Sequence, residues 1–194
     1  MTKTISKAVV ALGVVAGLGV AILPLSTYAA NPEDVTVQFQ VSPTISGGAS
    51  ICSAADGGAL TAGTTKTVTC DIGYSANSAS SVSIKDKDSN LNLVSGANNI
   101  APIATPVADI ATTAGTAGWG YKFAVTAAGA GSNGLTAVAA AANYAGITAS
   151  AVAVGNATAA VTNAAGTFTF GVSTAESTPS GTYSDIVTVA ITAS

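Results

Sequence analysis

The sequence contains no histidine and no arginine, and only 5% of its 194 residues are aromatic. The absence of histidine excludes His-ligated metals and catalytic triads or dyads that depend on an imidazole. The absence of arginine removes bidentate phosphate recognition, and six scattered lysines argue against a nucleic-acid partner. Charged residues make up only 8% of the chain, and no polar cluster is evident. The composition therefore predicts a non-enzymatic protein without a cofactor.

Residues 1–30 have the composition of an export signal. Lys3 and Lys7 form a short positive region before the uncharged apolar run Ala8–Leu23, which Pro24 ends. We expect this run to form a hydrophobic helix. The alternative to a cleaved signal is an uncleaved membrane anchor, since the run approaches the roughly 18 apolar residues that suggest a spanning helix.

Small residues after this run offer a cleavage site, which we expect between Ala29 and Ala30. Whether or not cleavage occurs, residues 31–194 are exported, and we expect a secreted or cell-surface protein. The membrane is then a partner only through an uncleaved N-terminal segment. Without residues 1–30 the chain has four lysines and nine acids, a net charge of −5.

Cys52 and Cys70 are the only cysteines. In an exported chain two cysteines more often form a disulfide than a redox or metal pair, and their spacing is not that of a C-x-x-C motif. We predict a Cys52–Cys70 disulfide, with two free core thiols as the alternative. Closing a loop of about 19 residues would contribute roughly 3 kcal/mol to stability.

Apolar and polar residues alternate along most of residues 31–194, which indicates strands with one buried and one solvated face. The alternating stretches are 35–41, 67–74, 81–85, 91–94, 119–125, 167–172 and 183–191. Clusters such as SGGAS, SGANN and TPSG separate them, as in a single-domain β-sandwich or barrel. The low-complexity segment Ala124–Ala165 predicts a mixture of one helical turn and one or two thin strands.

The sequence DKDSN raises the question of a calcium site at Asp86, Asp88 and Asn90. A calcium loop of the EF-hand type needs Gly at its sixth position and Glu at its twelfth, but Leu91 and Ala97 stand there. The alternative is a hairpin whose polar corner joins strands on either side, with side chains bonding to the backbone. We therefore predict no metal at this corner.

Trp119 heads an alternating face, so we expect it in the core. An exposed sugar-stacking platform, as in a carbohydrate-binding module, is the alternative. The nine acids are spread thinly, and none forms a distinguished pair of the kind that glycosidases use.

Residues 166–194 read as a strand, a Pro-Ser-Gly turn and a long closing strand, which predicts a terminal hairpin. The stretch Gly181–Asp185 followed by IVTVAIT resembles the closing strand of spore-coat-U-like pilins of the chaperone–usher type and the end of WxL-type cell-surface domains. The WxL signature itself is absent, because Val189–Ile191 stands in its place. The resemblance implies an all-β, immunoglobulin-like antiparallel sandwich used in adhesion or surface structure.

We thus expect a structural or adhesive subunit of a bacterial surface layer, fibre or pilus, and an extracellular carbohydrate-binding module is the alternative. The expected partners are other surface proteins, further copies of the chain, or glycans. Residues 31–41 follow the cleavage site, where a pilin-type donor strand would lie. The competing interpretation is that they form the first strand of their own sandwich.

Overall fold

The computed structural model describes residues 31–39, 54–58, 60–113, 115–130 and 134–193. The expected export segment, with cleavage at Ala29 and Ala30, lies outside these residues, as does Cys52. Within the described ranges no helix is long and apolar enough to cross a membrane.

The described part of the chain is almost entirely β-structure, as the alternation predicts. Its strands are β1 Asn31–Phe39, β2 Ala54–Asp56, β3 Thr65–Ala76, β4 Ser80–Asp86, β5 Leu93–Ser95, β6 Asn98–Ile100, β7 Gly118–Ala127, β8 Thr136–Ala137, β9 Val152–Ala157, β10 Val161–Ser173 and β11 Tyr183–Ala193. Two short 3-10 helices accompany them, η1 Ile110–Thr113 and η2 Ala139–Ala142. The segment Ala124–Ala165 is indeed a mixture, with η2 in place of a helical turn and β8 and β9 as thin strands.

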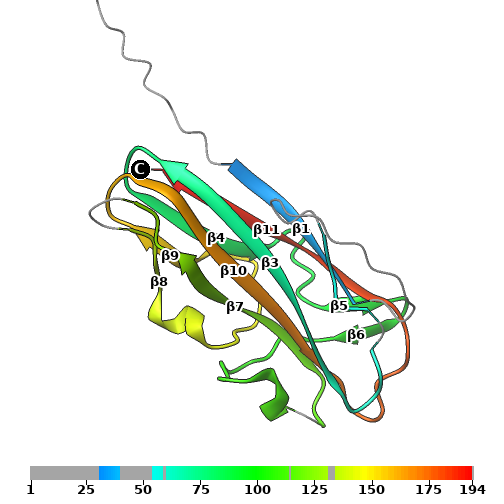
Figure 1. The fold of residues 1–194 in the computed structure, drawn as a ribbon. Helices are drawn as coiled ribbons and strands as arrows, with labels where there is room; N and C mark the ends of the chain where they lie inside the picture. Colours follow the sequence, from blue (N-terminus) through cyan, green and yellow to red (C-terminus); the bar gives the residue numbers. More distant parts are fainter. Residues whose placement is uncertain (1–30, 40–53, 59, 114, 131–133, 194) are drawn as a thin grey trace, which may run out of the picture.

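The strands form two sheets that lie one over the other (Figure 1). The larger sheet has the order β2-β1-β11-β4-β9-β8, with β5 beside β11 and β6 beside β5. The smaller sheet has the order β3-β10-β7, and both of its pairings are antiparallel. Only the short β1–β2 pair is parallel among the ladders of the described strands. The fold is an all-β, sandwich-like arrangement.

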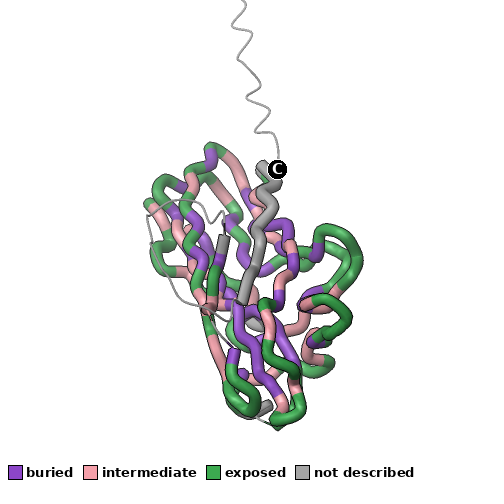
Figure 2. Tube along the Cα trace, turned by 90° about the vertical axis from the view of Figure 1, so that its right-hand side faces the viewer, coloured by how far each residue is buried: buried purple, intermediate pink, exposed green. Residues whose placement is uncertain are grey.

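The core lies between the sheets, and buried residues alternate with exposed ones along the strands (Figure 2). Phe168 and Phe170 of β10 are fully buried, and so are Trp119 and Phe123 of β7. The rings of Phe123 and Phe168 lie 4.8 Å apart at a tilt of 47°, a favourable arrangement for aromatic pairs. These aromatic residues are among the largest fully buried side chains of the described strands.

The C-terminal segment does not form the predicted hairpin. β10 belongs to the smaller sheet and β11 to the larger one, so the TPSG turn carries the chain from one layer to the other. A turn signal between two alternating stretches predicts a reversal of direction, but it does not specify whether the second strand pairs with the first. Here β3 and β7 occupy both edges of β10 instead.

The predicted hairpin at DKDSN is also wrong. β4 pairs with β11 and β9, whereas β5 pairs with β11 and β6, so the strands before and after the polar corner do not pair with each other. Leu91 lies outside β5 and is only partly buried. The corner is therefore an excursion from the larger sheet.

β1 pairs antiparallel with β11 over its whole length, from Asn31 opposite Ile191 to Phe39 opposite Tyr183. The segment predicted as either a donor strand or a first strand thus lies in the sheet of its own chain. The start of β1 and the end of β11 lie side by side at one end of the molecule (Figure 1).

Candidate metal centre

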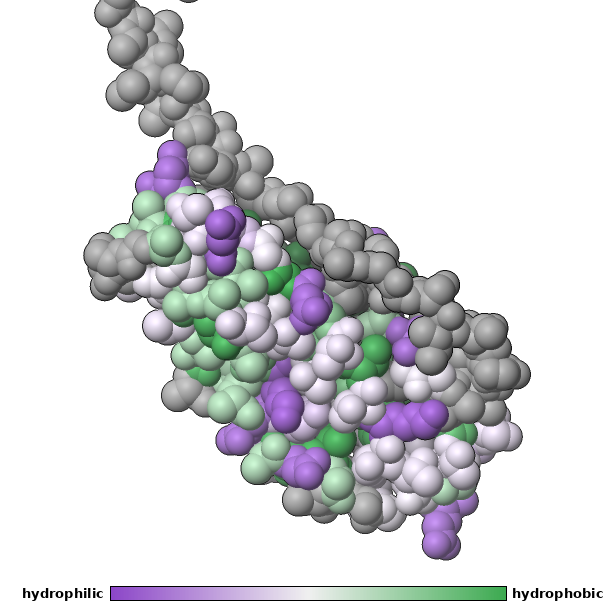
Figure 3. Space-filling view, in the orientation of Figure 1, coloured by the Kyte–Doolittle hydropathy of each residue, from purple (hydrophilic) through white to green (hydrophobic). Residues whose placement is uncertain are grey.

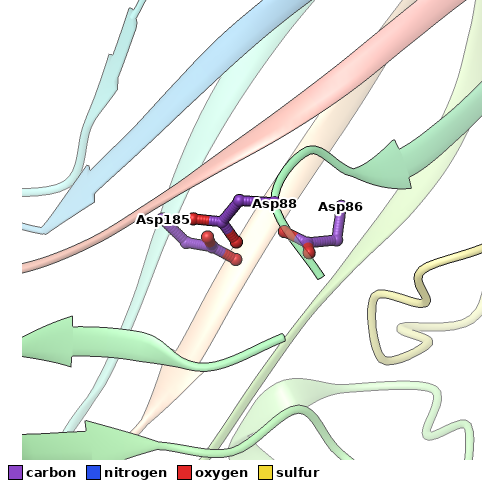
Figure 4. A group of neighbouring side chains, drawn as sticks. All are labelled: Asp86, Asp88 and Asp185. Carbon is purple, nitrogen blue, oxygen red and sulfur yellow. The ribbon is translucent and has the colours of Figure 1, made fainter. Parts of the chain in front are cut away.

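Three carboxylates meet where β4 leaves the edge of β11. The register pairs Asp86 with Val187, and continuing it by two residues brings Asp88 opposite Asp185. Since residues two apart on a strand share a face, the three side chains are expected on the same side of the sheet. Figure 4 shows them turned toward one another. One carboxylate oxygen from each acid lies within 4.8 Å of one from each of the others.

The chain leaves the sheet directly after Asp88. The β4 register would put residue 89 opposite Ser184, but Val94 of β5 stands there, so five additional residues leave the sheet. Ser89 adopts a φ of 69°, in the left-handed region that turns the chain sharply. The backbone N–H of Asn90 donates to Asp88 Oδ1 at 2.9 Å and closes the turn.

Two of these acids stand at strand positions where the alternation predicts core residues. Asp86 follows Val82 and Ile84 on the buried face of β4 and is 2% exposed. Asp185 lies between Tyr183 and Val187 on the buried face of β11 and is 7% exposed. Asp88 is exposed to solvent. The cluster therefore extends from the edge of the core to the surface.

Most oxygens of the two buried carboxylates lack hydrogen-bond partners among the described residues. Neither oxygen of Asp86 has one among the described residues, and nor does Oδ2 of Asp185. Asp185 Oδ1 accepts a hydrogen bond from the backbone N–H of Ile186 at 2.8 Å. Buried polar atoms in native proteins are nearly always paired, and an unpaired buried charge is especially costly. Three oxygens of these two carboxylates are thus left unpaired in the described part of the chain.

The pKa of Asp185 is raised to about 7, mainly by burial. The hydrogen bond from Ile186 opposes the rise, and the carboxylates of Asp86 and Asp88 add to it. Burial also raises the pKa of Asp86, with a smaller contribution from Asp88. The backbone N–H groups of residues 87–89 partly lower the pKa of Asp86, although none reaches its carboxylate in hydrogen-bonding geometry. The charged groups that act on both acids are therefore the other acids of the cluster.

The cluster differs from the calcium site that the DKDSN motif suggested in the sequence. Asp86 and Asp88 are two of its three acids, whereas Asn90 Oδ1 accepts a hydrogen bond from Asn92 Nδ2 at 3.2 Å. Asp185, which is distant in the sequence, completes the group. The atoms of the cluster that could bind a metal are all carboxylate oxygens, the ligands that hard cations prefer.

The sequence does contain a signal that Asp86 and Asp185 are buried. In VSIKD and YSDIV the alternation places Asp86 and Asp185 on the apolar faces of their strands. A carboxylate at a core-facing position is uncommon unless it is paired or binds a metal. Their contact depends on the pairing of β4 with β11, which no pattern in the sequence specifies.

Trp119 is in the core, as predicted. It is 0% exposed, and its indole N–H donates to the Leu91 carbonyl at 2.9 Å. Trp119 therefore does not provide an exposed platform for a sugar. Cys70 is buried on the inner face of β3. Because Cys52 lies outside the described residues, the Cys52–Cys70 disulfide stays a prediction.

The chain was compared with protein-family models, with curated proteins and with solved structures, and none of them matches. The resemblance of the closing strand to spore-coat-U-like and WxL-type proteins therefore remains an expectation.

Proposed function

We propose that this chain is an exported, non-enzymatic structural subunit of a bacterial cell surface, with an immunoglobulin-like sandwich as its body. Its partners are further copies of the chain or other surface proteins. Three features support the proposal: the export pattern of residues 1–30, the sandwich-like all-β fold, and the position of β1.

The position of β1 is the observation that carries the proposal. This strand begins one residue after the expected cleavage site and forms a nine-residue ladder with β11. The chain then passes through residues 40–53 to β2, a strand of three residues. A terminal strand that is bonded mainly to one neighbour is the kind of element that subunits exchange when they polymerise by strand addition.

One contact supports the immunoglobulin-like part of the proposal. The hydroxyl of Tyr183, at the start of β11, donates to the Pro179 carbonyl at 2.8 Å. A tyrosine that bonds back to the chain a few residues upstream, where it crosses between sheets, is a hallmark of immunoglobulin-like sandwiches. β10 and β11 lie in different sheets, so this corner is at such a crossing.

The surface composition is compatible with a structural role. On the face in Figure 3 the strongly hydrophilic side chains are scattered singly or in small groups among near-neutral ones. The low charge of the whole chain, 8% of its residues, gives little long-range steering toward a charged partner. Glycans remain a possible partner class, although the burial of Trp119 removes the residue proposed for stacking.

Surface labelling of the native organism tests the location. Lys85 and Lys87 are exposed, so a membrane-impermeant amine reagent should modify this protein on intact cells. A cytoplasmic protein of similar abundance serves as the control and should stay unlabelled. Equal labelling of both proteins only after lysis would contradict the proposal.

Removing β1 tests assembly by strand exchange. A chain without residues 31–39 should lose any SDS-resistant polymer, because the β11 edge no longer receives a donated strand. A synthetic peptide with the sequence NPEDVTVQF should raise its thermal midpoint, whereas a scrambled peptide should not. A deletion variant that is unfolded and does not respond to the peptide would show that β1 acts only as a first strand of its own sandwich.

A further inference from the structure

We propose that Asp86, Asp88 and Asp185 bind one Ca²⁺ ion where the excursion after β4 meets β11. The site is independent of the proposed surface role. It depends on two observations: the convergence of three carboxylates, and the presence of unpartnered oxygens on the two that are buried.

The unpartnered oxygens point to a missing positive charge. Asp86 and Asp185 are 2% and 7% exposed, and three of their four oxygens have no hydrogen-bond partner among the described residues. Like charges at this spacing repel strongly in a poorly solvated site, and each buried ion also loses its hydration. A divalent cation would remove the repulsion and replace the lost hydration with metal–oxygen bonds. Cation binding would therefore offset the free-energy cost of burying these two carboxylates.

The irregular ligand set favours calcium over magnesium. Two ligands on opposite sides of an ion are separated by twice the metal–oxygen distance, about 4.6–5.2 Å for Ca²⁺ and about 4.0–4.2 Å for Mg²⁺. The three oxygens lie within 4.8 Å of one another, a span that a calcium shell accommodates. Magnesium also requires near-ideal octahedral geometry, whereas calcium accepts the irregular ligand sets that strand edges provide.

The position of the site would let the ion enter from solvent and would let it link two parts of the chain. Asp88 is exposed, so the ion can enter from solvent and keep water ligands on that side. Asp88 directly precedes the five-residue excursion, and Asp185 belongs to β11. The ion would therefore connect the excursion to the central strand of the larger sheet. With three carboxylates and an open side, we expect an affinity typical of extracellular calcium modules, about 10⁻⁴–10⁻³ M.

The competing arrangement is a proton shared among the acids. In that case Asp185 would remain neutral and would donate a hydrogen bond to Asp86, as in carboxylate pairs that cannot both ionise. The two arrangements predict opposite effects of amide substitution. Asn mimics a neutral acid, so it would preserve a shared-proton arrangement and abolish calcium binding.

Calorimetric titration of the full, metal-stripped chain at pH 7.5 tests the site. We expect one Ca²⁺ per chain, and a rise of about 5–10 °C in the thermal midpoint when calcium exceeds its Kd about 100-fold. Asp185→Asn and Asp86→Asn should each weaken binding at least tenfold. Asp88→Asn should do the same, and because this side chain is exposed, its loss of binding cannot be attributed to misfolding. Asp71→Asn is the matched control, because Asp71 is exposed on β3 in the other sheet, and it should bind as the wild type does.

Three results would overturn the proposal. The first is a wild-type chain that gives no binding heat and no shift of its midpoint in 5 mM calcium. The second is an Asp88→Asn or Asp185→Asn variant that binds calcium as tightly as the Asp71→Asn control. The third is Mg²⁺ that binds as tightly as Ca²⁺ to the wild type, which would contradict the choice of ion.

Discussion

At the scale of single residues, the carboxylate of Asp185 is the most perturbed acid that the structure describes. It stands at a core-facing position of β11, and its surroundings favour the neutral form. An acid whose pKa is higher in the folded than in the unfolded chain binds more protons when folded. Its contribution to stability is therefore fully present below the unfolded pKa and is lost as the pH rises through the folded pKa.

For the metal-free chain this gives a definite pH dependence. The pKa of Asp185 rises from 3.8 to about 7, so the free energy of unfolding in EDTA should fall between pH 5 and pH 8 by about 2–3 kcal/mol. The raised pKa of Asp86 acts in the same direction. Urea denaturation at both pH values measures the change, and Asp185→Asn should reduce it. Stability of the metal-free chain that increases from pH 5 to pH 8 would contradict the prediction.

At the scale of elements, the packing of β7 on β10 depends on a glycine. The β7–β10 register shifts between Ala165 and Gly166, and a Cβ at Gly166 would overlap the ring of Phe123. Glycine therefore allows this ring to lie against β10, close to Phe168. The alternation of the sequence predicts both strands, but the contact between the ring and the glycine depends on the register.

Gly166→Ala should destabilise the chain by about 1–3 kcal/mol, because the added methyl forces the Phe123 ring from its place in a close-packed core. Gly73→Ala is a matched control on β3, since the nearest atom to its added Cβ is 3.8 Å away, an ordinary contact. It should change stability by less than about 0.5 kcal/mol. Chemical denaturation measures both variants, and equal midpoints would show that the ring moves at no cost.

At the scale of the whole molecule, the fold brings β3 of the smaller sheet next to the core with Cys70 facing inward. In an exported chain this position suits a structural disulfide with Cys52, which we expect to form. Such a bond would restrict the unfolded chain across a loop of about 19 residues and contribute roughly 3 kcal/mol to stability.

Peptide mapping without reduction should find Cys52 and Cys70 in one linked pair. Reduction should then lower the thermal midpoint by about 6–12 °C, since 1 kcal/mol corresponds to about 2–4 °C in a domain of this size. Cys52→Ser should give the same midpoint with and without reductant, and serves as the control. Detection of two free thiols in the native protein would establish the alternative of unpaired core cysteines.

The sequence by itself determined the long strands, because a period of two reports directly which side chains a strand buries. The strands β3, β4, β7, β10 and β11 all lie where alternation predicts them, and Trp119 is in the core. The sequence could not determine which strands pair. Turn residues predicted reversals at DKDSN and TPSG, whereas the chain makes an excursion at the first and crosses between sheets at the second.

The carboxylate cluster shows why the sequence predicts strands but not how they pair. Asp86 and Asp88 are close in the sequence, and the prediction of no metal site came from Leu91 and Ala97 at the loop positions that need Gly and Glu. The third acid of the cluster is almost 100 residues away. Only the pairing of β4 with β11 brings Asp185 to them. Side-chain alternation is a local property of the chain, whereas strand pairing follows from burying all of the apolar faces together. The inward positions of the two buried acids were visible in the sequence, but only the tertiary structure showed that they face each other.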